Sequence, residues 1–444
     1  MKKKAALENG NVVEEHLGIT RVTVAGYKSI AKEQSIEVRP LTILAGANSS
    51  GKSSLIQPLL ILKQTLESSY DPGALLLDGP NVRFTSANQF FSAQHIGKRL
   101  GRLRVGLVMA SLKHLSLSFA HYKNRGVEVV EMEQGSAERI YKYRVGMSSD
   151  DISRLFIGFR EAFGQKGQKI NWKLVRERCF LKPVLIVEEN GQEKQVATVQ
   201  IEDDVISGIR EIIHIPGLRG NPLRTYPLTP AGETFAGTFE NYTASVIAKW
   251  QNDKNNKLSL LNSDLLKLGL TNVVTAKTLN DTQVEVRVGR LQSITTKASQ
   301  DLVSIADVGF GVSQTLPVLV ALQVAHPGQL VYIEQPEIHL HPRAQTAMAQ
   351  VLADAALRGV RVVAETHSSL LLLGIQTLVA EGKLPPGLVK LHWFSRNKDG
   401  ETTIRSADLD DAGAFGNWPE DFADVALEAE SRYLDAAEAR QHIH

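Results

Sequence analysis

The sequence is short of several features that would assign a protein to a class directly. Its single cysteine, Cys179, excludes an internal disulfide and a cysteine-rich zinc site, which fits a reducing compartment. No apolar run approaches the roughly 18 residues of a membrane-spanning helix, and no apolar signal core follows the basic start. Lysine and arginine number 50 against 48 acidic residues, so the overall charge does not indicate a nucleic-acid-binding protein. A local basic groove is still compatible with this composition. We therefore expect a soluble cytoplasmic protein without a membrane partner.

A loop rich in glycine and serine stands between an apolar strand and an apolar helix within residues 41–60. Two glycines, a lysine and a hydroxyl occupy the offsets of a phosphate-binding loop. In such a loop the backbone N–H groups surround a phosphate, the lysine reaches the β- and γ-phosphates, and the hydroxyl ligates Mg²⁺. A chance match is the alternative, but the flanking strand and helix argue against it. We predict that a nucleoside triphosphate is bound by Gly46, Asn48, Ser49, Ser50, Gly51, Lys52, Ser53 and Ser54.

The patterning of the chain predicts an α/β fold made from both chain ends. Strands and helices alternate in the last third, as in a parallel sheet with crossover helices, whereas residues 101–201 alternate apolar and polar positions like antiparallel strands. We expect one half of the head at 15–100, an inserted α+β domain at 101–294, the other half at 295–405 and a tail at 406–444. The first helix should run to Glu67 with a kink at Pro58. A strand is expected from Leu75, and a helix that opens within Ser304–Gln314.

A second motif, Val331–Glu337, ends an apolar strand in acidic residues. Enzymes that hydrolyse nucleoside triphosphates place at such a strand end the carboxylate that orders Mg²⁺ and the base that activates water. With this motif the sequence resembles the ATP-binding-cassette (ABC) class. The resemblance implies ATP and Mg²⁺ as cofactors, with Ser53 and Glu334 at the metal and His367 as the switch histidine that reads the γ-phosphate.

The same resemblance assigns Phe310–Gln314 as the signature loop. In the ABC class two chains hold two ATP molecules head to tail, and each signature loop closes on the ATP of its partner. The resemblance therefore implies a homodimer or a higher homo-oligomer. The residues expected to close the site in trans are Gly311, Ser313 and Gln314.

The stretches GANSSGKSS, DVGFGVSQTLPVL, IEQPEIHLHPRAQ and AETHSSLLL narrow the resemblance to bacterial stand-alone ABC-type AAA ATPases of the RecF/SMC/OLD branch. Leu218–Tyr226 and Trp418–Phe422 resemble two further segments of one AAA-type group. ATPase subunits of antiphage systems, including PARIS, Septu and OLD-like ones, belong to this wider branch. The resemblance implies control of a separate effector, such as a nuclease, in antiphage defence.

One position departs from the ABC pattern. The class carries Asp followed by Glu where this chain carries Glu334 and Gln335, and an amide cannot take a proton from water. Glu337 or Glu365 could replace the missing base; otherwise ATP acts mainly as a clamp between subunits. We predict slow hydrolysis, and the candidate catalytic residues are Glu334, Gln335, Glu337 and His367.

Several residues leave alternatives open. Arg219 and Arg224 could reach a phosphate, nucleic acid or a partner, or could pin their own loop through bidentate salt bridges. Gln89 or Gln94 could be the glutamine that senses Mg²⁺ in the ABC class. His339, His341 and His367 could together suggest a metal site for an ion other than Mg²⁺. A structural explanation is better, because His341 starts a helix and His367 has the switch role.

Two other functions compete with effector control. A repair ATPase of RecF or SMC type would grip duplex DNA in a basic groove, with strong salt dependence. A nucleotide-gated scaffold with little turnover would follow from Gln335. A transporter ATPase is a poor fit, because the chain carries a large insertion and lacks the Asp–Glu pair.

Overall fold

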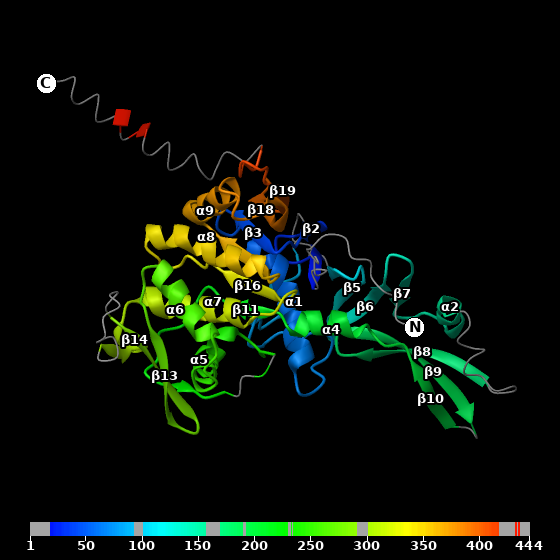
Figure 1. Cartoon of the computed structure of the whole chain (residues 1–444). Helices are drawn as coiled ribbons and strands as arrows, with labels where there is room; N and C mark the ends of the chain where they lie inside the picture. Colours follow the sequence, from blue (N-terminus) through cyan, green and yellow to red (C-terminus); the bar gives the residue numbers. More distant parts are fainter. Residues whose placement is uncertain are drawn as a thin grey trace, which may run out of the picture.

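The computed structural model describes residues 18–92, 101–156, 169–189, 192–229, 232, 234–290, 301–416, 431–432 and 434–435. The Trp418–Phe422 segment and Gln94 lie outside these residues. The described chain forms a head in which helices surround a central sheet, and an arm of strands β8–β10 that projects from it (Figure 1). Within this part of the chain, no helix combines the length and the hydrophobicity that a membrane crossing requires.

The central sheet of the head draws its strands from both ends of the chain. The neighbouring strands β11, β16, β17, β3 and β18 pair in parallel, and β19 adds an antiparallel edge. The predicted α/β head built by both chain ends is therefore confirmed. Because the parallel strands share one direction, their carboxyl ends meet at one edge of the sheet. In spatial order the strands are β11 (Ile213–Ile215), β16 (Leu330–Glu334), β17 (Arg361–Thr366), β3 (Leu41–Gly46), β18 (Val389–Arg396) and β19 (Thr402–Ala407).

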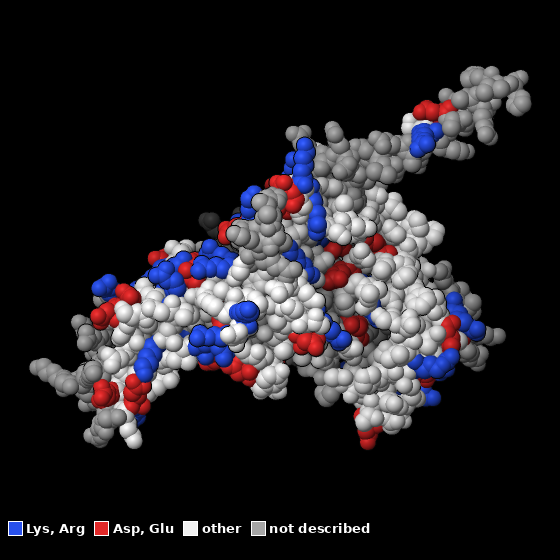
Figure 2. Space-filling view, turned by 180° about the vertical axis from the view of Figure 1, so that it is seen from behind, with Lys and Arg blue, Asp and Glu red and all other residues white. Residues whose placement is uncertain are grey.

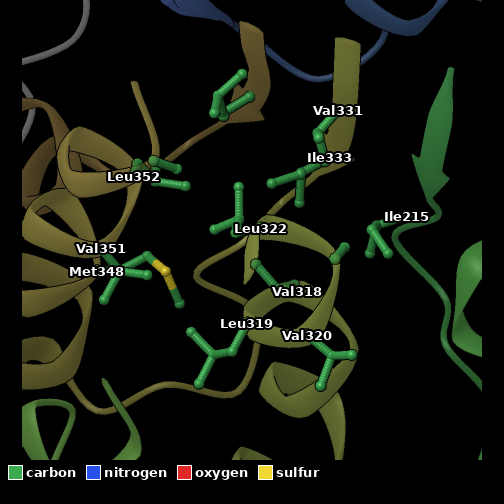
Figure 3. Packing of buried hydrophobic residues seen from close by; sticks show 14 of the residues in the cluster. Ile215, Val318, Leu319, Val320, Leu322, Val331, Ile333, Met348, Val351 and Leu352 are labelled. Carbon is green, nitrogen blue, oxygen red and sulfur yellow. The ribbon is translucent and has the colours of Figure 1, made fainter. Parts of the chain in front are cut away.

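Successive side chains of these strands face two separate cores, because side chains alternate across a strand. Ile43 of β3 packs in the core that contains the helices α5–α9, whereas Leu44 packs in the core that contains α1. Figure 3 shows Val331 and Ile333 of β16 facing Leu322 of α7. Each fully buried aliphatic side chain stabilises the fold by roughly 1.5–3 kcal/mol, so the packing on both faces of the sheet contributes to its stability. The helices are α1 (Lys52–Glu67), α5 (Thr243–Asn252), α6 (Lys257–Lys267), α7 (Phe310–Val324), α8 (Pro342–Leu357) and α9 (Ser369–Ala380).

The remaining strands form three antiparallel sheets, as the alternating pattern predicts. Strands β4–β7 continue a sheet begun by β1 and β2, so the middle of the chain is joined directly to its beginning. The expected part boundaries stay predictions. The sheets contain β2 (Gln34–Glu37), β1 (Ile19–Ala25), β4 (Arg102–Met109), β5 (His114–Tyr122), β6 (Gly126–Gly135) and β7 (Ile140–Arg144); β10 (Gln192–Thr198), β9 (Phe180–Glu189) and β8 (Lys169–Glu177); and β12 (Tyr226–Pro227), β14 (Gln283–Gly289), β13 (Val274–Asn280) and β15 (Leu302–Ser304).

Helix α1 ends at Glu67, as expected, and remains helical through Pro58. Its last carbonyls need donors from outside the helix. Arg178, between β8 and β9, donates to the carbonyls of Thr65 and Leu66 at 2.7 and 3.1 Å, and Arg210, at the end of α4 (Asp203–Arg210), donates to the carbonyl of Leu66 at 3.0 Å. The middle of the chain thus caps the helix that follows the phosphate-binding loop.

One expected element differs in the structure. The strand from Leu75 is wrong, because the side chain of Gln64 takes the backbone partners that a strand would use: its amide group bonds the carbonyls of Leu76 and Val82 and the N–H groups of Asn81 and Val82. The helix expected to open within Ser304–Gln314 is present as α7, which begins at Phe310; Ser304 caps a separate 3₁₀ turn before it, Ile305–Asp307.

A buried histidine predicts how stability depends on pH. His392 of β18 is fully buried; its Nε2 donates to the carbonyl of Glu37 and its Nδ1 lies 2.8 Å from Ser406 Oγ. Burial lowers the pKa of His392 from 6.5 to about 4. Since only the unfolded chain takes up this proton between pH 6.5 and 4, the stability contribution is complete above pH 6.5 and falls as the pH drops toward 4.

We expect wild type to lose about 3 kcal/mol of unfolding free energy more than His392→Gln over this window, because glutamine does not titrate. Urea unfolding of both proteins at half-unit pH steps measures the difference. His326→Gln is the control, since His326 is exposed. Parallel pH profiles for wild type and His392→Gln would contradict the assignment.

Candidate nucleotide site

The phosphate-binding loop lies where β3 ends and α1 begins, with two glycines in backbone conformations that disfavour other residues. Gly46 has a φ of 141° and Gly51 a φ of 104°. A Cβ at Gly46 would stand 2.2 Å from the carbonyl oxygen of Phe394, and one at Gly51 2.3 Å from Thr402 Oγ1. Both glycines are therefore required by a close neighbour as well as by φ, a backbone carbonyl at Gly46 and a side-chain hydroxyl at Gly51. The loop turns immediately before the N-terminus of α1, where backbone N–H groups favour an anion.

Lys52 is buried within the loop. Its Nζ donates to the carbonyl oxygens of Gly46 at 3.0 Å and Ala47 at 2.8 Å. Burial lowers the pKa of Lys52, and the charges of Glu365 and Glu337 oppose this shift. The loop therefore holds a desolvated cation next to the helix N-terminus, which is an arrangement that favours binding of a polyanion.

Ser53 contacts a carboxylate from the opposite end of the chain. Its Oγ donates to Glu365 Oε1 at 3.0 Å, and the hydroxyl of Tyr332 donates to Glu365 Oε2 at 2.8 Å. Burial raises the pKa of Glu365, and the charge of Glu334 adds to this effect. The sequence indicated Glu365 only as a possible replacement for the catalytic base and did not predict its hydrogen bond with Ser53.

Glu334, the expected partner of Ser53 at the metal, makes other contacts. Its Oε1 lies 3.3 Å from His214 Nε2, and its Oε2 accepts from the N–H of Gly217 at 3.1 Å. Burial alone would raise the pKa of Glu334, but the bond with His214, the charge of that ring and the Gly217 N–H bring the pKa below its ordinary value. His214 also stacks on Tyr332. The carboxylate is thus ionised, and its hydrogen-bond partners come from β11 and the residues directly after it.

The remaining predicted catalytic residues follow the ends of β16 and β17. Gln335 has a φ of 48° and donates its N–H to the carbonyl of Glu365 at 2.7 Å. Glu337 Oε1 accepts from Thr366 Oγ1 at 2.7 Å and from the N–H of His367 at 3.0 Å. Burial and the charge of Lys52 lower the pKa of His367, which keeps the ring neutral at physiological pH. Glu337 therefore holds the backbone of His367, the predicted switch histidine.

These elements enclose a pocket of about 350 Å³. It brings together the loop residues 48–54 with Gln335, Glu365 and His367, but Glu334 and Glu337 are not among its lining. Four lining residues were not predicted. Gln57 lies one helical turn after Ser53, and Arg396 ends β18 beside the loop strand, so helix period and strand order could have indicated them. The unpredicted residues are Lys28, Ser29, Gln57 and Arg396.

The signature residues lie at the start of α7 and do not line this pocket. Ser313 Oγ donates to the carbonyl of Phe310 at 3.2 Å, and Gln314 Nε2 donates to the carbonyl of Gly220 at 2.7 Å. A Cβ at Gly311 would approach the carbonyl of His339 to 3.4 Å, so the helix start packs closely on the segment after β16. Their role on a partner's ATP stays a prediction.

The structure ties both arginines to their own chain. Arg219 donates from Nη1 to the carbonyl of Gln314 at 3.0 Å, and from Nη2 to the carbonyls of Glu334 and Gln335 at 2.7 and 3.1 Å. The exposed Arg224 makes a bidentate salt bridge with Asp307 at 2.7 and 3.0 Å. The bidentate salt bridge that one alternative expected is present at Arg224, whereas Arg219 bonds three backbone carbonyls instead.

Other candidates have local structural partners. Gln89 accepts from the N–H groups of Thr85 and Ser86 in a capping box. His341 caps α8, and the ring of His339 packs near Phe310. Within the described ranges, no group of three or more histidine, cysteine, aspartate or glutamate side chains could hold a metal ion. On the face in Figure 2, basic and acidic side chains are interspersed.

Comparisons with known proteins add a partial match. A family model described as "AAA domain, putative AbiEii toxin, Type IV TA system" matches residues 220–373, which span α7, β16, α8 and β17. This match, together with the phosphate-binding loop, supports a nucleotide-binding ATPase. No curated protein matches the chain.

Solved structures of SMC heads are similar to the chain at low identity. An SMC head bound to the C-winged helix domain of ScpA has 13% identity and a TM-score of 0.46, covering 89% of this chain and 99% of its own. The SMC head domain from Thermotoga maritima has 10% identity and a TM-score of 0.40, covering 88% and 100%. An SMC head from Pyrococcus furiosus, bound to the C-terminal domain of ScpA, has 10% identity and a TM-score of 0.43, covering 95% and 100%.

The two arginines provide a matched test of the pinned loop. Arg219→Lys should lower the free energy of unfolding by about 3 kcal/mol, because one ammonium cannot replace a planar fork that bonds three buried carbonyls. Arg224→Lys should leave the free energy of unfolding nearly unchanged, since its salt bridge is exposed. Urea unfolding measures both, and equal losses would show that Arg219 does not carry the loop.

Proposed function

We propose that the protein is an ABC-type ATPase that binds ATP with Mg²⁺ and hydrolyses it slowly. One observation carries this proposal: a buried lysine within a phosphate-binding loop faces a pocket that Gln335, Glu365 and His367 complete from the other end of the chain. In the proposed complex the triphosphate lies along the loop, and Lys52 exchanges its bonds with the loop carbonyls for bonds with phosphate oxygens.

The residues around Ser53 fit Mg²⁺. The Ser53 hydroxyl oxygen and Glu365 Oε1 lie 3.0 Å apart beside the loop, and oxygen atoms of both kinds are ligands that Mg²⁺ prefers. Mg²⁺ would be held there by Ser53, with Glu365 and the ionised Glu334 ordering its water ligands. The ion would supply charge neutralisation for the phosphates. Lys52 would bind and orient the same phosphates from the loop side.

Slow turnover follows from the group that occupies the position of the base. Gln335 lines the pocket, and its amide orients water without accepting a proton. Glu365 lies in the pocket too, but both its oxygens accept hydrogen bonds, from Ser53 and Tyr332. Glu337 is engaged with Thr366 and His367, so neither carboxylate is placed to replace the missing base directly.

In the proposed cycle, ATP joins two chains head to tail, so that Gly311, Ser313 and Gln314 of one chain close the ATP site of the other. Phe310 directly precedes Gly311, and Leu218 precedes Arg219, which bonds the carbonyl of Gln314. Both apolar side chains are exposed, Phe310 at 50% and Leu218 at 89%. Burial of such side chains against a second copy would favour association by roughly 1.5–3 kcal/mol each.

The dimer would control a separate effector protein, such as a nuclease, in antiphage defence in the cytoplasm. The description of the matched family model names a toxin–antitoxin system, which fits an ATPase that regulates a partner. A RecF- or SMC-type grip on DNA is the second candidate, and the nearly equal numbers of basic and acidic residues, 50 and 48, do not favour it. A scaffold with little turnover differs from the main proposal only in rate.

ATP turnover of wild type, Lys52→Ala and Gln335→Glu tests the catalytic proposal. Wild type should turn over far more slowly than the roughly ten per second of an ordinary enzyme. Gln335→Glu should be faster by on the order of tenfold or more, because a positioned carboxylate restores general-base catalysis. Lys52→Ala should lose ATP binding and remain without turnover.

A fast wild-type enzyme that Gln335→Glu leaves unchanged would refute the missing base and assign Glu365 or Glu337 to that role. Binding of a fluorescent ATP analogue to each variant, measured beside turnover, separates loss of affinity from loss of chemistry. ATP binding by Lys52→Ala at wild-type strength would refute the proposed site itself.

The molecular mass in solution tests the dimer. Wild type should double its mass with ATP and Mg²⁺, and Phe310→Ser should weaken this association by on the order of tenfold, the equivalent of 1.4 kcal/mol of lost burial. Leu112→Ser is the matched control, because Leu112 is also exposed, at 64%, but lies in the turn between β4 and β5. Equal association of both variants, by analytical ultracentrifugation, would exclude this face.

A further inference from the structure

Two stacked rings lie beside the carboxylates of the candidate nucleotide site. His214 of β11 and Tyr332 of β16 are directly opposite each other in the parallel pairing, and their ring centroids are 5.5 Å apart with an interplanar angle of 16°. Glu334 follows Tyr332 by two residues and is paired with Glu365 of β17. Because side chains two residues apart lie on the same face of a strand, both rings and both carboxylates occupy the face of the sheet that packs on α1.

Each ring donates a hydrogen bond to one carboxylate. The Tyr332 hydroxyl donates to Glu365 Oε2 at 2.8 Å. His214 Nε2 lies 3.3 Å from Glu334 Oε1, and it carries the hydrogen of this contact because an ionised carboxylate only accepts. Both ring side chains are buried, a setting in which such bonds are strong. The orientation of each carboxylate therefore depends on one ring.

The two carboxylates need these donors because they carry like charges on neighbouring strands. Burial and the charge of Glu334 raise the pKa of Glu365. The other oxygen of each carboxylate has a second donor, the Ser53 hydroxyl for Glu365 and the Gly217 N–H for Glu334. Without the ring donors, one bond would remain on each carboxylate, and the two groups would lower their repulsion by turning apart or by taking up a proton.

A further side chain holds the histidine from the loop after α1. Asn81 Oδ1 lies 3.2 Å from His214 Nδ1, so each ring nitrogen has a partner. The N–H of Asn81 donates to Oε1 of Gln64 in α1 at 3.2 Å. The helix that begins with the phosphate-binding lysine is thus linked to Glu334 through this series of contacts.

We propose that His214 and Tyr332 are positioning residues that fix the two carboxylates of the proposed Mg²⁺ site, one ring for each carboxylate. The inference rests on the proposed function, in which Mg²⁺ is held by Ser53, with Glu365 and Glu334 ordering its water ligands. Neither ring is among the lining of the nucleotide pocket, so both act through the carboxylates and not on the nucleotide. Loss of a group that orients a metal-binding side chain typically lowers metal affinity by roughly 10- to 100-fold.

The Mg²⁺ dependence of nucleotide binding tests this role without measuring turnover. The full chain is titrated with a fluorescent ATP analogue at increasing free Mg²⁺ and, separately, in EDTA. His214→Leu and Tyr332→Phe should each raise the Mg²⁺ concentration for half-maximal binding roughly tenfold, and should leave the affinity in EDTA unchanged. Phenylalanine keeps the stacked ring, so the tyrosine variant removes only the hydroxyl.

Two further variants separate positioning from a merely structural role. His214→Gln keeps an N–H donor at about the place of Nε2, so its Mg²⁺ dependence should be close to that of wild type. Ile213→Ala is the matched control, because Ile213 is fully buried on the same strand but packs in the opposite core. This control should lower the melting temperature and leave the Mg²⁺ dependence unchanged.

An unchanged Mg²⁺ dependence in either His214→Leu or Tyr332→Phe would overturn the proposal, and Tyr332→Phe decides it alone should the leucine variant not fold. Equal effects of His214→Leu and His214→Gln, or a loss of affinity in EDTA as large as that with Mg²⁺, would also overturn it, because the role would then be structural only. Each of these results leaves the proposed ATPase intact. Absence of nucleotide binding by wild type would instead refute the ATPase and this inference together.

Discussion

The parallel pairing of β3 with β17 and β18 is the constraint on which the nucleotide site depends. β3 comes from the start of the chain and its two neighbours from the last quarter. Only this order brings Ser53, which follows β3, within 3.0 Å of Glu365 near the end of β17. The entropy of closing so long a loop grows only with the logarithm of its length, so the inserted strands cost the site little. They also contribute to it, because Arg178 and Arg210 cap the helix that carries Lys52.

Buried charges at the strand ends are stable because each has specific partners. Lys52 is bonded to two loop carbonyls, Glu365 to two hydroxyls, and Glu334 to a histidine and a backbone N–H. In a buried setting such bonds are strong, and an unpaired group is costly. Binding of a polyanion must therefore exchange partners and cannot simply fill space. The carbonyl of Ala47 also accepts from the N–H of Ser50 at 3.3 Å, which limits the cost of that exchange.

The sequence predicted what depends on local spacing, and missed what depends on which strands become neighbours. The loop at Gly46–Ser53, the length of α1 and the alternation of strands and helices all follow from periodicity. The bonds of Glu365 with Ser53 and of His214 with Glu334 depend on the order β11–β16–β17–β3, which no local pattern encodes. The strand expected from Leu75 failed for a similar reason, because Gln64, eleven residues earlier, takes the hydrogen bonds of that segment.

The backbone of Gln335 shows how the side chain at this position can differ without disturbing the site. Its N–H bonds the carbonyl of Glu365, its carbonyl accepts from Arg219, and its φ of 48° is held by both contacts. The side chain is thus presented to the pocket by a backbone that does not depend on its terminal atoms. Amide and carboxylate have nearly the same shape, so at this position geometry is retained and only the ability to accept a proton differs. The chain keeps the complete phosphate loop and places an amide at this position, which is why we propose nucleotide binding with slow hydrolysis.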